Sequence, residues 1–236
     1  MHLTEDDFQN GKVLLIDKPL EWTSFDVVNF LRAFIRKIFN IKKLKVGHAG
    51  TLDPLATGLL IICTGRKTKE IDNYQGMDKV YVGSMHFGAT TPSFDGETEI
   101  DSEFDISDIT PGRLQEATKQ FTGEIEQFPP AYSAIKVDGK RAYNLARKNK
   151  EVKLKSRKVM INDFTLLNID LPRIDFAVSC SKGTYIRSLV DDFGKVLDKG
   201  AYLTELRRTQ IGEFNVNDAL TVDEFRKGIL AETINI

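Results

Sequence analysis

The 236-residue chain has few residues of the types that bind metals or form disulfides, and it has no long apolar run. Its two cysteines, Cys63 and Cys180, lie far apart and neither belongs to a C-x-x-C pair, which favours buried thiols in a reducing compartment. The three histidines add no metal-ligand spacing. No apolar run reaches the roughly 18 residues of a membrane span, and the N-terminus lacks the pattern of a signal peptide. We therefore expect a cytoplasmic protein without a membrane segment or a bound metal.

The sequence also lacks internal repeats, low-complexity tracts and a linker rich in proline, glycine or serine. Hydrophobic residues make up 41% and charged residues 28% of the chain, which is ordinary for a globular protein. A chain of this length can form one large domain or two small ones.

Basic and acidic residues are unevenly distributed along the chain, although they nearly balance to a net charge of −1. Residues 80–112 contain no lysine or arginine, whereas residues 136–158 contain ten basic residues and two acidic ones. A second basic patch, in residues 32–45, precedes a glycine-rich loop. Such segregation can steer a polyanion to one face of a protein. The charge pattern alone also fits an alternative, in which the two basic stretches are solvated helical faces and the acidic stretch is a loop.

The glycine-rich loop carries a single acid, Asp53, and is followed by the apolar run Leu59–Cys63. Glycine allows sharp turns and close approach of a ligand to the backbone, and Pro54 favours an extended backbone at Asp53. The apolar run has the length of a buried strand. These features suit an acid held in one geometry, but they also fit an ordinary Asp-Pro turn.

The segment Gly47–Gly58, which reads GHAGTLDPLATG, closely resembles the catalytic motif of the TruB-type tRNA pseudouridine synthases. It is also similar to the motif of the related dyskerin-type enzymes, which work with guide RNAs. The resemblance implies that Asp53 is the catalytic residue. It also makes His48, Gly50 and Thr51 candidates for substrate binding.

The segment before this loop resembles the first motif of the same family. Residues 17–28 read DKPLEWTSFDVV, and Glu21 stands where the family usually has glycine. Apolar spacing predicts a strand over Gly11–Ile16 and a helix over Asp26–Phe39, with Thr23 and Ser24 available as N-caps.

Alternation predicts a strand over Lys79–Gly88, and the resemblance implies that Tyr81 within it stacks on the target base. Without the resemblance, a strand tyrosine is usually a core or cross-strand residue. Residues 88–95 resemble the next family segment, which makes Asp95 a candidate binding residue. The intervening Pro92, Ser93 and Phe94 depart from the usual pattern.

The stretch Gln127–Arg147 is aromatic and basic, and such a surface suits phosphate contacts together with base or sugar packing. Alone it would be unspecific. It resembles a family signature in a region that forms a mobile thumb on RNA, so we expect a thumb-like RNA-binding segment at about residues 128–158. Its candidate substrate-binding residues are Tyr132, Lys136, Arg141 and Arg147.

Residues 180–187, which read CSKGTYIR, resemble the family motif whose arginine pairs with the catalytic aspartate. On this basis we expect Arg187 to pair with Asp53, and Lys182 and Tyr185 to bind substrate. The alternative for Arg187 is a surface ion pair on a helix, which is the commoner case. Further along, LTELRRT at 203–209 matches a family segment with a final strand, and residues 221–224 form a capping box.

The matching segments run from about Gly11 to Glu224. The resemblance therefore implies one catalytic domain over residues 1–236, without the extra C-terminal RNA-binding module found on many relatives. It also implies an α+β pseudouridine-synthase fold, with a mixed, largely antiparallel sheet flanked by helices and a basic thumb insertion. The strand and helix signals show no strict βαβ rhythm, which agrees with that class.

The resemblance implies isomerisation of uridine 55 in the T-loop of tRNA. Breaking the N1–C1′ bond and rejoining the base through C5 needs no redox change or group donor, so we expect no cofactor. It needs a nucleophilic carboxylate beside a flipped nucleotide, the role given to Asp53, and His48 is a candidate to fill the vacated space. Nearby Arg187 would favour the ionised carboxylate. Whether Asp53 attacks C6 or C1′, and which group removes the C5 proton, stay open.

Two other functions remain as alternatives. A non-catalytic RNA-binding or tRNA-folding module would use the same surface, but Asp53, Tyr81 and Arg187 together favour an enzyme. A phosphate-binding NTPase is suggested by the glycine-rich loop, yet the order G-x-x-x-x-G-K-[ST] does not occur. Within the family resemblance, the interpretation that must be distinguished from a stand-alone enzyme is a guide-RNA-dependent enzyme. The short chain favours a stand-alone monomer that acts on the T-arm of tRNA without a guide RNA.

Overall fold

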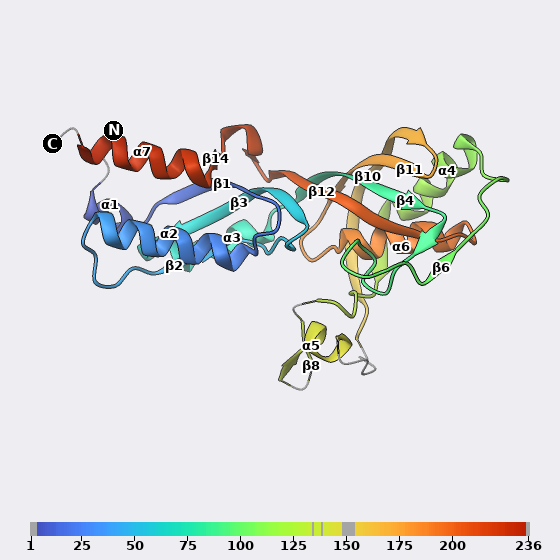
Figure 1. Ribbon diagram of the computed structural model, residues 1–236, viewed down its shortest axis with the longest axis horizontal. Helices are drawn as coiled ribbons and strands as arrows, with labels where there is room; N and C mark the ends of the chain where they lie inside the picture. Colours follow the sequence, from blue (N-terminus) through green and yellow to red (C-terminus); the bar gives the residue numbers. More distant parts are fainter. Residues whose placement is uncertain (1–3, 134, 138, 148–153, 235–236) are drawn as a thin grey trace. The chain divides into compact units, whose positions relative to one another are not determined.

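The computed structural model describes residues 4–133, 135–137, 139–147 and 154–234. The chain divides into two compact units (Figure 1). One comprises Met1–Tyr81 with Arg207–Ile236, and the other comprises Val82–Leu206. Strands β4 (Lys79–Phe87) and β12 (Ala201–Ile211) each contribute residues to both units.

The sheet of the first unit has the strand order β14-β1-β3-β12. Strand β1 (Val13–Lys18) pairs antiparallel with β3 (Ala56–Thr64), from Val13 opposite Cys63 to Lys18 opposite Gly58. The short strands of this unit are β2 (Val46–His48) against β3, β14 (Leu220–Thr221) parallel to β1, and β13 (Phe214–Asn215) against β12. The first strand begins two residues later than predicted, because Gly11, at φ +116°, caps helix α1 (Glu5–Asn10).

Helix α2 (Ser24–Ile38) confirms the helix predicted from apolar spacing. It begins at Ser24 because Thr23 and Asp26 form a reciprocal capping box, with side chain and backbone exchanging hydrogen bonds. Its buried face, which includes Leu31 and Ile35, packs with Ile16 and Leu60 of the sheet. Burying each such side chain contributes roughly 1.5–3 kcal/mol.

The C-terminal helix α7 (Val222–Ile234) lies beside α2, and the Phe225 and Phe34 rings are 6.4 Å apart (Figure 1). It begins with the predicted capping box, in which the Glu224 carboxylate accepts from the Thr221 backbone at 2.8 Å. The other helical segments of this unit are α3 (Ile71–Gly76), η1 (Gly65–Glu70) and η3 (Val216–Asp218).

The second unit has the strand order β12-β4-β11-β10-β7. Strands β10 (Arg157–Asp170) and β11 (Arg173–Cys180) form a long antiparallel pair, and β7 (Gly123–Gln127) pairs with the first part of β10. Strands β5 (Ala89–Thr90) and β6 (Ser102–Glu103) form a separate ribbon.

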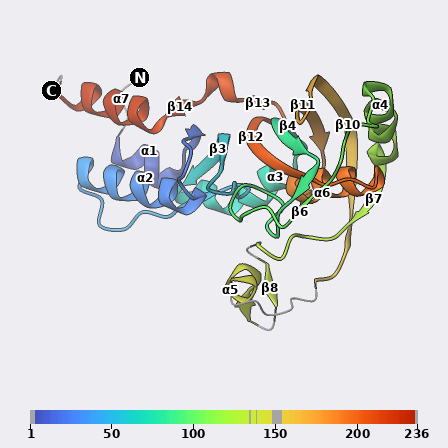
Figure 2. The same ribbon diagram turned by 45° about the vertical axis from the view of Figure 1, so that its right-hand side comes forward.

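The core of the second unit is aromatic. Helix α4 (Pro111–Thr118) packs on β10 (Figure 2), and η2 (Lys119–Phe121) and α6 (Ile186–Val196) complete the helices outside the thumb segment. Neighbouring ring centroids lie 5.6–6.2 Å apart among Phe87, Phe121, Phe164, Phe176 and Phe193. Such edge-to-face pairs add to the stabilisation from burial.

The predicted thumb segment contains a small ribbon and a short helix. Strands β8 (Lys136–Val137) and β9 (Lys140–Arg141) pair antiparallel, and α5 (Ala142–Ala146) follows directly. Figure 2 labels β8 and α5 of this group next to each other.

The expected α+β fold, with a mixed and largely antiparallel sheet flanked by helices, is confirmed. Cys63 and Cys180 are buried free thiols, as predicted. Over the described ranges, no helix is both long enough and apolar enough to cross a membrane.

Candidate active site

Asp53 lies on the loop between β2 and β3, and the backbone on both sides of it is fixed. The Ser24 hydroxyl at the start of α2 accepts from Leu52 N at 2.8 Å and donates to Leu52 O at 3.2 Å. After the acid, Ala56 N donates to Asp53 O at 3.1 Å. The Asp53 residue itself is half-buried. The loop therefore presents a partly accessible carboxylate from a rigid backbone.

The turn before α2 also contacts this loop. Glu21 N donates to Pro54 O at 2.9 Å, and Glu21 has a left-handed backbone with φ +66°. A non-glycine residue in this region is strained, which is consistent with the glycine usual at this place in the family. The turn forms despite the departure, because the hydrogen bond to the loop is kept.

Lys18, which the sequence motifs did not mark as a site residue, donates hydrogen bonds to the backbone of the same loop and of the turn before α2. Its side chain is fully buried, and Nζ donates to the carbonyls of Pro19, Trp22 and Pro54 at 2.9, 2.5 and 3.5 Å. Burial lowers the pKa of Lys18 from 10.5 to about 8, the Asp53 charge opposes this shift, and the Arg208 charge adds to it. The sequence pointed to this residue only as the lysine of the motif Asp17-Lys18-Pro19.

Arg208 is the second buried cation at the loop, with only 1% of its surface exposed. Its Nε donates to Leu59 O at 2.8 Å and its Nη2 to Gly50 O at 3.1 Å. The neighbouring Arg207 donates to both carboxylate oxygens of Asp17, at 3.0 and 2.7 Å. Lys18 from the first segment of this unit and Arg208 from its second segment therefore both bind the Asp53 loop.

The other predicted residues of this unit differ in exposure. Burial, followed by the charge of Arg208, lowers the pKa of His48, so its imidazole is neutral at pH 7. Thr51 is exposed, whereas Tyr81 on β4 is only 8% exposed. Gly50 has φ +104°, a conformation that favours glycine. Their predicted contacts with substrate stay predictions.

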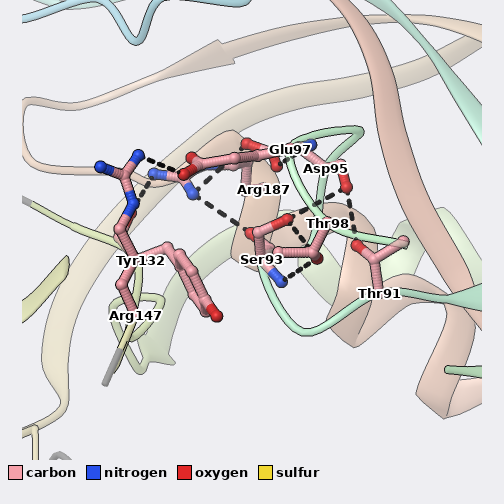
Figure 3. A network of polar contacts seen from close by, with 8 residues as sticks. All are labelled: Thr91, Ser93, Asp95, Glu97, Thr98, Tyr132, Arg147 and Arg187. Atoms are coloured by element: carbon pink, nitrogen blue, oxygen red, sulfur yellow. Dashed lines mark hydrogen bonds and ion pairs between the residues drawn. The ribbon is translucent and has the colours of Figure 1, made fainter. Parts of the chain in front are cut away.

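Arg187 and Asp95 form a buried ion pair in the second unit (Figure 3). Arg187 Nη1 lies 3.4 Å from Asp95 Oδ2, and the guanidinium also donates to the carbonyls of Ser93 at 3.1 Å and Tyr132 at 2.9 Å. Asp95 Oδ1 accepts from Glu97 N at 2.9 Å. Thr91 and Ser93 hydroxyls donate to Asp95 O. Because Asp53 belongs to the other compact unit, its pairing with Arg187 stays a prediction.

The first residues of the thumb segment are attached to the start of α6. Gln127 exchanges two hydrogen bonds with the Tyr185 backbone, at 2.7 and 3.0 Å, and Ser188 Oγ donates to Phe128 O at 2.7 Å. The Arg157 guanidinium lies 4.6 Å from the centre of the Tyr185 ring. Tyr185 is thus held by backbone bonds and by a cation–π contact.

The basic candidates of the second unit lie in different segments of the chain. Arg147 Nη2 is 2.5 Å from Glu97 Oε1, and its guanidinium lies 5.6 Å from the centre of the Tyr143 ring. Lys136 and Arg141 are opposite each other in the β8–β9 ribbon. Lys182 is exposed in the turn before α6.

Almost the whole chain resembles chains in solved structures of two complexes. One is the crystal structure of a Cbf5-Nop10-Gar1 complex, with a TM-score of 0.70 and 30% identity, over 94% of this chain and 55% of that chain. Another is an H/ACA ribonucleoprotein bound to a substrate RNA containing 2′-deoxyuridine, with a TM-score of 0.68 and 27% identity, over 97% of this chain and 56% of that chain. This chain therefore spans about half of each of those chains and has the pseudouridine-synthase fold.

Family comparisons are more specific. Residues 36–186 match the TruB family pseudouridylate synthase N-terminal domain, and residues 187–234 match the tRNA pseudouridylate synthase B C-terminal domain. A Flavobacterium johnsoniae protein named tRNA pseudouridine synthase B is 52% identical over 96% of this chain and 100% of its own length. A Phocaeicola vulgatus protein of the same name is 52% identical over 93% of both chains. The chain belongs to the TruB family of pseudouridylate synthases and is an isomerase of that family.

Proposed function

We propose that this protein converts uridine 55 in the T-loop of tRNA into pseudouridine, as a monomer and without a guide RNA. Relatives named tRNA pseudouridine synthase B, matched over almost their full length, support tRNA as the substrate. The observation that carries the proposal for the site is the fixed Asp53 loop, with buried Lys18 and Arg208 bound to its backbone. A cytoplasmic location stays a prediction.

In the proposed reaction, the target uridine leaves the RNA stack, which costs a few kcal/mol. The Asp53 carboxylate acts as the nucleophile and bonds either to C6 of the base or to C1′, and the N1–C1′ bond breaks with its electron pair on N1. The base turns and C5 bonds to C1′, while the bond to Asp53 breaks and frees the carboxylate. The product then loses the proton on C5 and gains one on N1.

The other residues have proposed supporting roles. Tyr81 stacks on the flipped base, and Arg187 orients the acid. His48, which is neutral at pH 7, fills the space that the base vacates. Gly50, Thr51, Lys182 and Tyr185 contact the substrate near the target nucleotide. The thumb residues Tyr132, Lys136, Arg141 and Arg147 contact the backbone and bases of the T-arm, and Asp95 positions Arg187.

The test uses unmodified tRNA that carries tritium at uracil C5, incubated with purified protein and no other RNA. Wild type is expected to release tritium, and Asp53→Asn is expected to release none while keeping its tRNA affinity. A tRNA with cytidine at position 55 is the matched substrate control and should release nothing from that position. Gel filtration of the same protein tests the monomer.

Three results would each contradict a part of the proposal. If well-folded wild-type protein binds tRNA but releases no tritium, the protein is a binding module and not this enzyme. If Asp53→Asn retains turnover, the nucleophile is another group. Release that requires an added guide RNA would place the chain with the guide-dependent enzymes.

A further inference from the structure

Two residues of the thumb segment, Tyr132 and Arg147, contact one cluster of polar residues in the second unit (Figure 3). Tyr132 O accepts from Arg187 at 2.9 Å. Arg147 forms an ion pair with Glu97 at 2.5 Å. Asp95 connects the two contacts, because it pairs with Arg187 and accepts from Glu97 N.

We propose that Glu97 is a positioning residue for RNA binding: in the free protein its carboxylate occupies the place on Arg147 that a backbone phosphate takes in the complex. The inference rests on the proposed function, since it requires an RNA substrate. Glu97 therefore holds the thumb against its own unit until RNA replaces it.

The chemistry of the pair fits such an exchange. A guanidinium binds carboxylate and phosphate with the same fork of N–H donors, so either anion can satisfy Arg147. The pair is accessible, with 60% of the Arg147 side chain and 34% of the Glu97 side chain exposed. Exposed ion pairs are weak, and a phosphate can therefore displace the carboxylate at little cost. The Tyr143 ring beside Arg147 offers a surface for a sugar or base.

The buried pair fixes the backbone of Glu97. Glu97 N donates to Asp95 Oδ1 at 2.9 Å, and the Asp95 side chain is 7% exposed. Glu97 also belongs to the stretch 80–112, which contains no lysine or arginine. In the free protein, the ion pair neutralises one acidic charge of this stretch and holds the Arg147 side chain next to the Arg187–Asp95 pair.

The test is a double-mutant cycle on equilibrium binding of unmodified tRNA, in the Asp53→Asn background so that no turnover occurs. Glu97→Gln is expected to tighten binding about 2- to 5-fold, since it removes a competitor worth as much as a surface ion pair. In the Arg147→Met background the same substitution is expected to have no effect. The matched control is Glu99→Gln, which removes the same charge from an exposed residue two positions away and should leave affinity unchanged.

Steady-state kinetics in the otherwise wild-type protein give a second readout. Glu97→Gln should lower KM and leave kcat unchanged, whereas general damage to the fold would lower kcat. The inference is overturned if Glu97→Gln weakens binding or does not change it. An equal gain from Glu99→Gln, or an equal gain without Arg147, would also overturn it, because the effect would then be general charge repulsion. Wild-type protein that acts on tRNA while Glu97→Gln has no effect would refute this inference alone; wild-type protein that binds no tRNA would refute the proposed function with it.

Discussion

Arg187 Nη1 lies 3.4 Å from Asp95 Oδ2, and only 5% and 7% of the two side chains are exposed. The guanidinium also satisfies two backbone carbonyls, one before Asp95 and one at the root of the thumb. A buried charge is tolerated when it is paired and hydrogen-bonded in this way. Removing one partner leaves the other charge buried without compensation.

Asp95→Asn should therefore destabilise the second unit strongly. The substitution keeps the size of the side chain and an oxygen that can accept from Glu97 N, but it removes the charge that Arg187 faces. We expect a loss of about 3–5 kcal/mol, measured as the shift in urea-unfolding midpoint. Glu103→Gln, at an exposed position of β6, is the control and should change the midpoint little. Equal midpoints for the two variants would show that the buried pair does not stabilise the unit.

The lowered pKa of Lys18 predicts how the free energy of unfolding depends on pH. Burial lowers its pKa from 10.5 to about 8 in the folded protein, so the unfolded chain binds more protons between these values. This group's contribution to the free energy of unfolding therefore rises as pH increases from 8 to 10.5. The stability of wild type relative to Lys18→Met should rise by roughly 1–3 kcal/mol over that range, measured by urea unfolding at each pH. A constant difference would mean that Lys18 keeps an ordinary pKa.

Gly58→Ala should disrupt β3, the strand that follows the Asp53 loop. Gly58 has φ +103°, and a Cβ at this position would lie 2.3 Å from Arg208 O. Strain and overpacking together should cost about 3 kcal/mol or more. Gly76→Ala is the matched control, because its Cβ would meet nothing within 4 Å, and thermal unfolding should show almost no change. A stable Gly58→Ala variant would contradict the close approach of β12 to β3.

Local features of this chain could be predicted from its sequence because their causes are local. The capping boxes at Thr23 and Thr221 depend on residues three positions apart, and the buried run Leu59–Cys63 needs no partner to be recognised. The fold class followed from the family resemblance. The start of β10 at Arg157 was hidden, because its first residues belong to a basic run that resembles a flexible surface.

The residues that bind the Asp53 loop could not be predicted in the same way. Arg208 reaches Gly50 across 158 positions of sequence, and Lys18 reaches Pro54 across 36. A motif marks such residues as interesting, but only the fold shows which carbonyl each one binds. The ion pair between Glu97 and Arg147 is a contact of the same kind, between an acidic segment and a basic one that charge patterning had described separately.

Each compact unit contains one buried thiol, and the alkylation rate of that thiol reports how often the unit opens. Cys63 lies on β3 of the first unit and is 0% exposed, and Cys180 lies on β11 of the second and is 1% exposed. Burial raises the pKa of Cys63 to about 11, so this sulfur reacts only when its strand opens. The alkylation rates of the two cysteines therefore measure the opening of the two units independently. The measurement needs no added label and can be made in free protein and in the presence of RNA.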